Sequence, residues 1–324
     1  MKDPYFDLLK IGYLVRHFAD YALVPRWFHR MRRNSILRRL TPSERQEVDR
    51  RVAYYNRLKE STPIENGQKV ADYRFPFKEK RRFTTYFFDL YDVVKYFGKE
   101  NRFFVIPGDV THVPEVPTFV KSRPIAHDDS NANSVILKLN KLRHFTLIRH
   151  DKPFAEKKDI LVGRTAWANA SPQRRLLYER FGNHPLCDVG KTRREDSSDL
   201  PYTIKSYLSR KQQLDCKFIA SIEGNDVATN LKWIMSSNSV AVSPPLHFET
   251  WFMEGQLIPD YHYIQVKPDF SDLIEKLEYY MGHPEEAEAI IAHAHEYIRQ
   301  FTDKRMERAV QLAVAQKYFA QTNV

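Results

Sequence analysis

Short apolar runs alternate with helix-length segments through most of the chain. Buried strands are predicted at 102–106, 159–162, 217–222, 239–242 and 261–266. Short strands separated by helices are typical of parallel α/β sheets. Apolar residues recur every three or four positions over 287–301 and 303–319, which predicts helices near the end of the chain. The pattern therefore predicts an α/β protein with a helical C-terminal part.

The first forty residues are basic and amphipathic. They carry nine Lys and Arg against three Asp, so they hold +6 of the chain's net charge of +10. Aromatic and aliphatic residues interleaved with arginine are typical of a helix at an anionic membrane surface. The same pattern suits a helical cap on the body of the protein, with its arginines reaching into water. Both interpretations stay open at this point.

The chain length, a helix-start signal and a proline-rich cluster predict the domains. The 324 residues, 42% of them hydrophobic, suffice for two ordinary domains. Thr41-Pro42-Ser43-Glu44 is a helix-start signal, and the Pro and charge cluster at 151–158 is a candidate hinge. The expected domains are a basic helical segment at 1–60, an N-terminal lobe at 61–152, a C-terminal lobe at 153–302 and a final helix at 303–324.

Composition excludes several classes of protein. The longest stretch without a charged residue, 233–248, has 16 residues and contains two prolines, so no transmembrane helix is predicted. No signal-peptide pattern opens the chain, and two cysteines suit a reducing compartment. We expect a cytoplasmic protein, peripheral at the inner membrane face if residues 1–40 bind lipid. Nucleic-acid binding is not expected, because no zinc-finger spacing or RNP-like motif accompanies the charge.

Familiar cofactor and metal motifs are missing. The chain has no G-x-G-x-x-G, G-x-x-x-x-G-K-[ST], H-E-x-x-H, C-x-x-C or G-x-S-x-G sequence. It also has no D-x-D triplet, the carboxylate spacing with which many sugar-nucleotide enzymes hold a divalent cation. We therefore expect neither a metal nor an organic cofactor.

Asp109 is the candidate general base. It lies directly after the predicted strand at 102–106, and ligands of open α/β sheets bind at that edge. A carboxylate there can accept a proton from a hydroxyl group. The alternative is an Asp that only closes the turn after Pro107 and Gly108.

The segment 217–232 is a candidate phosphate site. A predicted strand leads through a turn into a predicted helix, whose first N–H groups would bind an anion. The candidate nucleotide-binding residues here are Gly224, Asn225, Asp226, Thr229, Asn230 and Lys232. An ordinary strand-to-helix turn capped by Asn225 or Asp226 is the alternative. Asp226 would suit a cap or a sugar hydroxyl better than a phosphate.

Two further groups complete the candidate donor site. Arg164 and Thr165 follow the strand at 159–162, and Arg174 opens the next segment, so guanidinium groups could clamp phosphate oxygens. Glu249 and Trp251 would suit a sugar, with hydroxyls on the carboxylate and the ring against the indole. Trp251 suits a hydrophobic core equally well.

The segment from Lys217 to Leu273 resembles the C-terminal lobe of glycosyltransferase family 90. The resemblance is carried by the strand, the Gly224 turn and the block from Pro259 through His262-Tyr263 to Ser271-Asp272-Leu273. The Asp109 loop with Val116-Pro117 resembles the family loop that holds the proposed catalytic base. The 163–165 and 171–174 segments resemble its R-G-x-x-T-S-x-x-R segment.

This resemblance implies a GT-B-like architecture of two Rossmann-like lobes and an inverting, metal-independent transfer from a UDP-sugar. Residues 121–124 and 140–144 look like the bacterial lipopolysaccharide branch, which implies a lipid-linked oligosaccharide acceptor and acceptor-binding roles for Lys121 and Arg123. Glu223 and Asn230 stand where eukaryotic-pattern members carry Arg. The alternatives are a protein O-glycosyltransferase acting on Ser or Thr and a non-catalytic basic protein that binds membrane or RNA.

Overall fold

The computed structural model describes residues 4–75, 84–166 and 171–323. The chain divides into two compact units. The five-stranded unit comprises residues 143–247 and 254–300. The helical unit comprises the residues up to 142, together with 248–253 and the chain from 301 onward. The last helix therefore belongs with the N-terminal part of the chain.

The five-stranded unit is built on a parallel sheet. Its strands are β7 (Lys158–Thr165), β8 (Cys187–Lys191), β9 (Cys216–Ala220), β10 (Val240–Ser243) and β12 (Ile264–Gln265). They lie in the order β12-β10-β9-β7-β8, and each neighbouring pair is parallel. Read from β8 and numbered along the chain, this order is 2-1-3-4-5, which is that of a doubly wound sheet. The strand order reverses between β7 and β9, and this place is called the switch point. The fold class is therefore α/β, as predicted.

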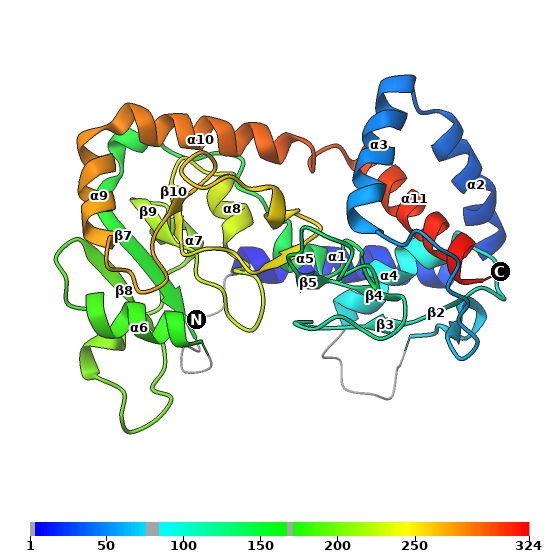
Figure 1. Ribbon diagram of the computed structural model, residues 1–324, viewed down its shortest axis with the longest axis horizontal. Helices are drawn as coiled ribbons and strands as arrows, with labels where there is room; N and C mark the ends of the chain where they lie inside the picture. The colour runs from blue at the N-terminus through cyan, green and yellow to red at the C-terminus, as the bar shows by residue number, and fades with distance from the viewer. Residues whose placement is uncertain (1–3, 76–83, 167–170, 324) are drawn as a thin grey trace. The chain divides into compact units, whose positions relative to one another are not determined.

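Helices pack against this sheet (Figure 1). They are α6 (Pro172–Phe181), α7 (Arg210–Gln213), α8 (Leu231–Met235), α9 (Leu273–Gly282) and α10 (Pro284–Arg299), with single turns at Phe154–Glu156, Pro201–Thr203 and Glu254–Gln256. Apolar residues of the strands form one core with side chains from α6, α9 and α10. The short helix α5 (Lys141–His144) lies at the sequence division between the units.

The helical unit contains the longer N- and C-terminal helices. These are α1 (Pro4–Leu23), α2 (Arg26–Arg38), α3 (Pro42–Tyr55), α4 (Thr84–Val94) and α11 (Lys304–Thr322). Helix α11 packs against α3 (Figure 1). A turn at Val70–Asp72 follows β1. No described helix is long and apolar enough to cross a membrane.

Three small sheets complete the helical unit. β3 (Val105–Ile106), β4 (Thr118–Val120) and β6 (Ser134–Ile136) form a parallel sheet. β1 (Gln68–Lys69) pairs antiparallel with β2 (Arg102–Phe103), and β5 (Ser122–Pro124) pairs antiparallel with β11 (Phe248–Thr250). β11 comes from the middle of the other unit's sequence, so the helical unit is assembled from three separate segments.

Several predicted elements change their limits. The strand at 102–106 divides into β2 and β3, and the helix expected to reach about residue 60 ends at Tyr55. The capping box at Thr41 and Glu44 is confirmed. The helix expected directly after Asp226 is wrong, because residues 224–230 form bends and turns and α8 begins only at Leu231.

Candidate functional site

Arg174 is held at the switch point of the parallel sheet. It lies in the first turn of α6, and its Nε and Nη2 donate to the carbonyl oxygen of Ile222, at 3.1 and 2.9 Å. Its Nη1 lies 3.4 Å from Oγ1 of Thr165, the last residue of β7. Ile222 follows β9, so the guanidinium joins the carboxyl ends of β7 and β9. Ligands of doubly wound sheets bind at this place.

The loop at 221–230 is fitted closely around this guanidinium. A Cβ atom added to Gly224 would lie 2.9 Å from Arg174 Nη2 and 3.1 Å from its Cζ, so only glycine leaves room for the arginine. Ser171 Oγ donates to the carbonyl oxygen of Glu223 at 2.9 Å. The start of α6 and the loop are thus fixed to each other by Ser171 and Arg174. Of the predicted site residues, the structure brings together Thr165, Arg174 and Gly224.

Arg174 donates hydrogen bonds to neutral oxygens, and the carboxylates of Asp226 and Glu223 act on its charge from nearby. Its bonds to Ile222 and Thr165 go to a carbonyl and a hydroxyl oxygen. Burial lowers the pKa of Arg174, because a charged guanidinium loses hydration when buried. An arginine of such high ordinary pKa nevertheless stays charged near neutral pH. The switch point therefore presents a guanidinium beside a close-fitting backbone loop, and the planar fork of a guanidinium suits an anion.

Arg164 is committed to other contacts. Its Nη2 reaches both carboxylate oxygens of Asp188 at 2.7 Å, and its Nε donates to the Ser206 carbonyl at 2.8 Å. Its Nη1 donates to the carbonyl oxygens of Gly163 and Asp188. A guanidinium has five N–H donors, and these five acceptors account for all of them. Arg164 thus braces β7 against β8, and this geometry does not favour a phosphate-binding role.

Lys232 and Asn230 also make internal contacts. Lys232 is fully buried and forms an ion pair with Glu254, which is buried as well. Asn230 precedes α8, and its amide donates to the Ala220 carbonyl at 2.8 Å. A buried cation that meets a carboxylate adds no net charge for a ligand. These contacts favour structural roles for both residues.

The remaining loop candidates differ in exposure. Asn225 is exposed, Thr229 is partly buried and Asp226 is buried. Because α8 has only five residues and starts after this loop, the helix N-terminus predicted at 224–230 is not there. Any anion site must therefore be formed by the loop and Arg174.

Asp109 lies in the helical unit and is paired with Lys121. Lys121 Nζ is 2.6 Å from Asp109 Oδ1, and the lysine is buried while a third of the Asp109 side chain is exposed. Gly108 has a φ of 103°, which a residue with a side chain rarely adopts, and so sets the direction of the loop. Lys121 reaches its partner from the segment between β4 and β5. The pair therefore holds the Asp109 carboxyl group in a fixed orientation beside a buried lysine.

Arg123, Glu249 and Trp251 lie inside the helical unit. Arg123 Nε donates to Glu249 Oε1 at 2.7 Å, across the β5–β11 pair, and both side chains are fully buried. The indole of Trp251 stacks on Tyr55 with centroids 3.9 Å apart, and its Nε1 donates to Glu307 Oε2 at 2.8 Å. These contacts favour the core role for Trp251 and give Arg123 and Glu249 a structural role in place of ligand binding.

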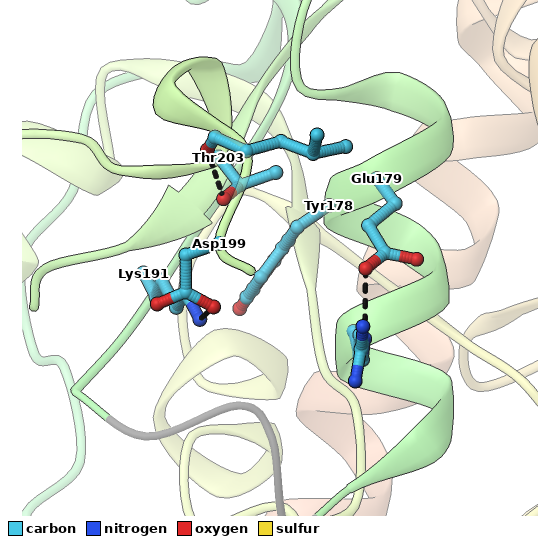
Figure 2. A pocket seen from close by; sticks show the side chains of 7 residues that line it. Tyr178, Glu179, Lys191, Asp199 and Thr203 are labelled. Atoms are coloured by element: carbon cyan, nitrogen blue, oxygen red, sulfur yellow. Dashed lines mark hydrogen bonds and ion pairs between the residues drawn. The ribbon is translucent and has the colours of Figure 1, made fainter. Parts of the chain in front are cut away.

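A small cavity beside α6 is visible in Figure 2. Tyr178, Glu179, Lys191, Asp199 and Thr203 line it together with Arg175 and Leu200. Lys191 forms an ion pair with Asp199, and Glu179 accepts from Arg175 at 2.7 Å. Its volume of about 10 Å³ admits roughly one water molecule, far less than a sugar needs.

No group of three or more His, Cys, Asp or Glu side chains is placed to hold a metal within 4–75, 84–166 and 171–323. The acidic partners of the candidate cations were missed by sequence reasoning. Asp188 and Glu254 stand 24 and 22 residues from Arg164 and Lys232, with no local spacing that links them. The Ile222 carbonyl that holds Arg174 is a backbone atom and leaves no sequence signal.

Comparison with known proteins decides the family. The model of glycosyl transferase family 90 matches residues 171–314. The chain is also 41% identical, over 314 residues, to the O-glucosyltransferase LpsA of Dichelobacter nodosus, covering 96% of this chain and 95% of that protein. The chain belongs to glycosyltransferase family 90. It is therefore a glycosyltransferase, as the resemblance implied.

A second protein is similar over a shorter length. The uncharacterized protein 035R of Invertebrate iridescent virus 3 is 31% identical over 99 residues, which cover 30% of this enzyme and 9% of the viral protein. The family 90 match begins at Ser171, the residue before α6, so it includes Arg174 and the 221–230 loop. Thr165 and Asp109 precede it.

Proposed function

We propose that this family 90 enzyme transfers glucose from UDP-glucose to a hydroxyl of a lipopolysaccharide core or a related cell-surface glycan, with inversion at the anomeric carbon. The single observation that carries the donor part is Arg174 held against Gly224 at the switch point of a doubly wound sheet. The sugar is proposed from the printed activity of the Dichelobacter nodosus relative. The proposed architecture is GT-B, with the five-stranded unit as the nucleotide lobe.

In this proposal Arg174 and the 221–230 loop stabilise the departing diphosphate. A guanidinium suits paired phosphate oxygens because its donors form a planar fork. The missing Cβ of Gly224 lets the backbone loop close on this guanidinium and fix its place. Fixed dipoles and one cation then do what a divalent ion does in other sugar-nucleotide enzymes, so no metal is required. Transfer in the presence of EDTA should equal transfer without it, and loss on chelation would contradict this part.

Asp109 is the proposed general base. Its carboxylate accepts the proton of the acceptor hydroxyl as the oxygen attacks the anomeric carbon from the side opposite to UDP, so one bond forms while the bond to the diphosphate breaks. Lys121 binds Asp109 Oδ1 and so holds the carboxylate in one orientation. This role replaces acceptor binding as the proposal for Lys121.

The test is Asp109→Asn. The amide cannot accept the proton, so transfer should fall about 10²- to 10⁴-fold while UDP affinity, measured by calorimetry, stays unchanged. The acceptor part is tested separately by offering core oligosaccharide and Ser- or Thr-containing peptides. Near-normal transfer by the variant would refute the base assignment, and exclusive glucosylation of peptides would replace the acceptor proposal with the protein O-glycosyltransferase alternative.

A further inference from the structure

Helix α1 carries its apolar face on the outside. Residues on one side of a helix recur at intervals of three and four, and here positions 8, 11, 15, 19, 22 and 23 share a side. Leu8, Ile11, Val15 and Leu23 are 60–78% exposed. Ala19 and Ala22 between them are exposed as well. No charged residue interrupts this side of the helix.

The opposite side of α1 faces the protein and carries polar and aromatic side chains. Tyr13 donates to Asp89 Oδ1 of α4 at 2.7 Å, and His17 Nε2 lies 3.3 Å from Asp92 Oδ2. Asp20 forms an ion pair with the buried Lys95. A helix that docked only as a structural cap would bury its aliphatic residues. α1 is instead anchored by polar and aromatic side chains and leaves most of its aliphatic ones exposed.

Aromatic contacts with α4 also fix the orientation of α1. Phe18 meets Phe88 edge-on at 4.6 Å, and Tyr21 meets Tyr91 at 4.9 Å between ring centroids. These rings belong to the cluster formed on α4. Turning α1 over would break this packing together with the ion pairs. The outward position of Ile11 and Val15 is therefore a consequence of where the helix is tied down.

Helix α2 also exposes large apolar side chains. Trp27 and Met31 lie one turn apart and are 61% and 68% exposed, and Phe28 beside them is 42% exposed. Arg30, Arg32 and Arg38 are exposed around them. Large aromatic residues with one apolar and one polar edge are enriched where a membrane meets water.

The charge of residues 8–40 indicates what binds to the exposed apolar sides of α1 and α2. From residue 8 to residue 40 the only acid is Asp20, which is already paired with Lys95. The bases in this range are Lys10, Arg16, Arg26, Arg30, Arg32, Arg33, Arg38 and Arg39. A second copy of the chain would bring these like charges together, which is unfavourable. An anionic lipid surface attracts them and receives the apolar side chains between them.

We infer that the outward faces of α1 and α2, here called the α1–α2 face, bind an anionic lipid bilayer, with the aliphatic and aromatic residues among the acyl chains and the arginines at the headgroups. This goes beyond the proposed function, because it assigns a membrane-docking surface that takes no part in donor binding. The probe is a vesicle of phosphatidylcholine with or without phosphatidylglycerol.

The main test is the full-length double variant Ile11→Glu with Val15→Glu in a vesicle co-sedimentation assay. Both side chains already lie in water, so the fold is kept, while binding to phosphatidylglycerol vesicles should fall about tenfold or more. The matched control is Leu200→Glu with Ile258→Glu, two exposed apolar residues of the five-stranded unit, which should bind like the unchanged protein. UDP affinity should be the same in all three proteins, whether or not the proposed transfer reaction is correct.

A second variant separates charge from apolar burial. Arg16→Glu with Arg38→Glu should remove the preference for phosphatidylglycerol over phosphatidylcholine vesicles. Equal pelleting of the Ile11/Val15 variant and the unchanged protein would overturn the inference, as would failure of the unchanged protein to bind either vesicle. A solution dimer that the Ile11/Val15 substitutions disperse would also overturn it, because a second copy would then cover the face.

Discussion

Buried cations meet different partners in the two units. Inside the helical unit, Arg51 lies 2.6 Å from Glu307 Oε1, and Lys138 pairs with the other oxygen of the same carboxylate. At the switch point of the five-stranded unit, Arg174 meets the Ile222 carbonyl and the Thr165 hydroxyl. The first arrangement neutralises charge and holds segments together. The second holds a guanidinium by hydrogen bonds to neutral oxygens at the strand ends where a doubly wound sheet binds ligands.

The contrast sorts cations that look alike in the sequence. Arg164 lies close to Arg174 in the sequence and belongs to the same unit. It nevertheless pairs with a carboxylate, that of Asp188, as the buried cations of the helical unit do. Lys232 follows the same rule through Glu254. A cation that pairs with a carboxylate is therefore assigned a structural role, and one that is held by neutral oxygens is a candidate for ligand binding. Residue type and distance from a strand end do not make this distinction.

The largest expected effect comes from breaking the buried pair in the helical unit. Glu307→Ala removes the carboxylate shared by Arg51, Lys138 and Trp251 Nε1. Two buried cations then lose the carboxylate that both contact, and the free energy of unfolding should fall by about 3–5 kcal/mol. Urea denaturation measures the change.

The matched control is Glu47→Gln, which breaks an exposed ion pair with Arg50 on the same unit. Exposed pairs contribute little, so its unfolding curve should overlay that of the unchanged protein. Equal, small losses in the two variants would mean that the buried charges are already well hydrated, and the comparison between the units would fail.

The next effect tests the switch point itself. Arg174→Ala should weaken UDP binding by about tenfold or more, since a charge-assisted hydrogen bond contributes roughly 1.5–3 kcal/mol. Arg164→Ala is the control and should leave UDP affinity nearly unchanged, because its guanidinium already binds Asp188. Titration calorimetry on both variants decides between them. A larger loss for Arg164→Ala would reverse the assignment of the two arginines.

The smallest expected effect is the loss of stability in acid caused by His262, a buried imidazole that is neutral until it gains a proton. Burial lowers the pKa of His262 to about 4, from its ordinary 6.5, and its Nδ1 accepts the Ile258 N–H at 2.9 Å. The unfolded chain therefore binds a proton before the folded one does, so stability falls as pH drops from 6.5 toward 4. At pH 5 the loss should be about 1–2 kcal/mol relative to pH 7.

His262→Asn keeps an acceptor for the Ile258 N–H but has no proton to gain. Its free energy of unfolding should change less between pH 7 and pH 5 than that of the unchanged protein, when both are measured by urea denaturation. An identical pH profile in the two proteins would show that other groups dominate acid sensitivity.

Sequence patterns located the secondary structure better than the site. The runs at 159–162, 217–222 and 239–242 correspond to β7, β9 and β10, because continuous apolar segments have to be buried. β8 was not predicted, since Cys187-Asp188-Val189-Gly190-Lys191 mixes apolar and polar residues. Of the candidate site residues, Thr165, Arg174 and Gly224 lie together. The candidates that make buried internal contacts instead are Lys232, Glu249 and Trp251.

By itself the sequence determined the fold class, the family and the basic N-terminal segment, because these depend on local periodicity, motif spacing and charge, which are properties of the chain order. Only the tertiary structure decided which cations are neutralised and which side of α1 faces outward. Both depend on partners from distant segments, such as Asp188 for Arg164 and Asp89 for Tyr13, and no local pattern encodes such pairs.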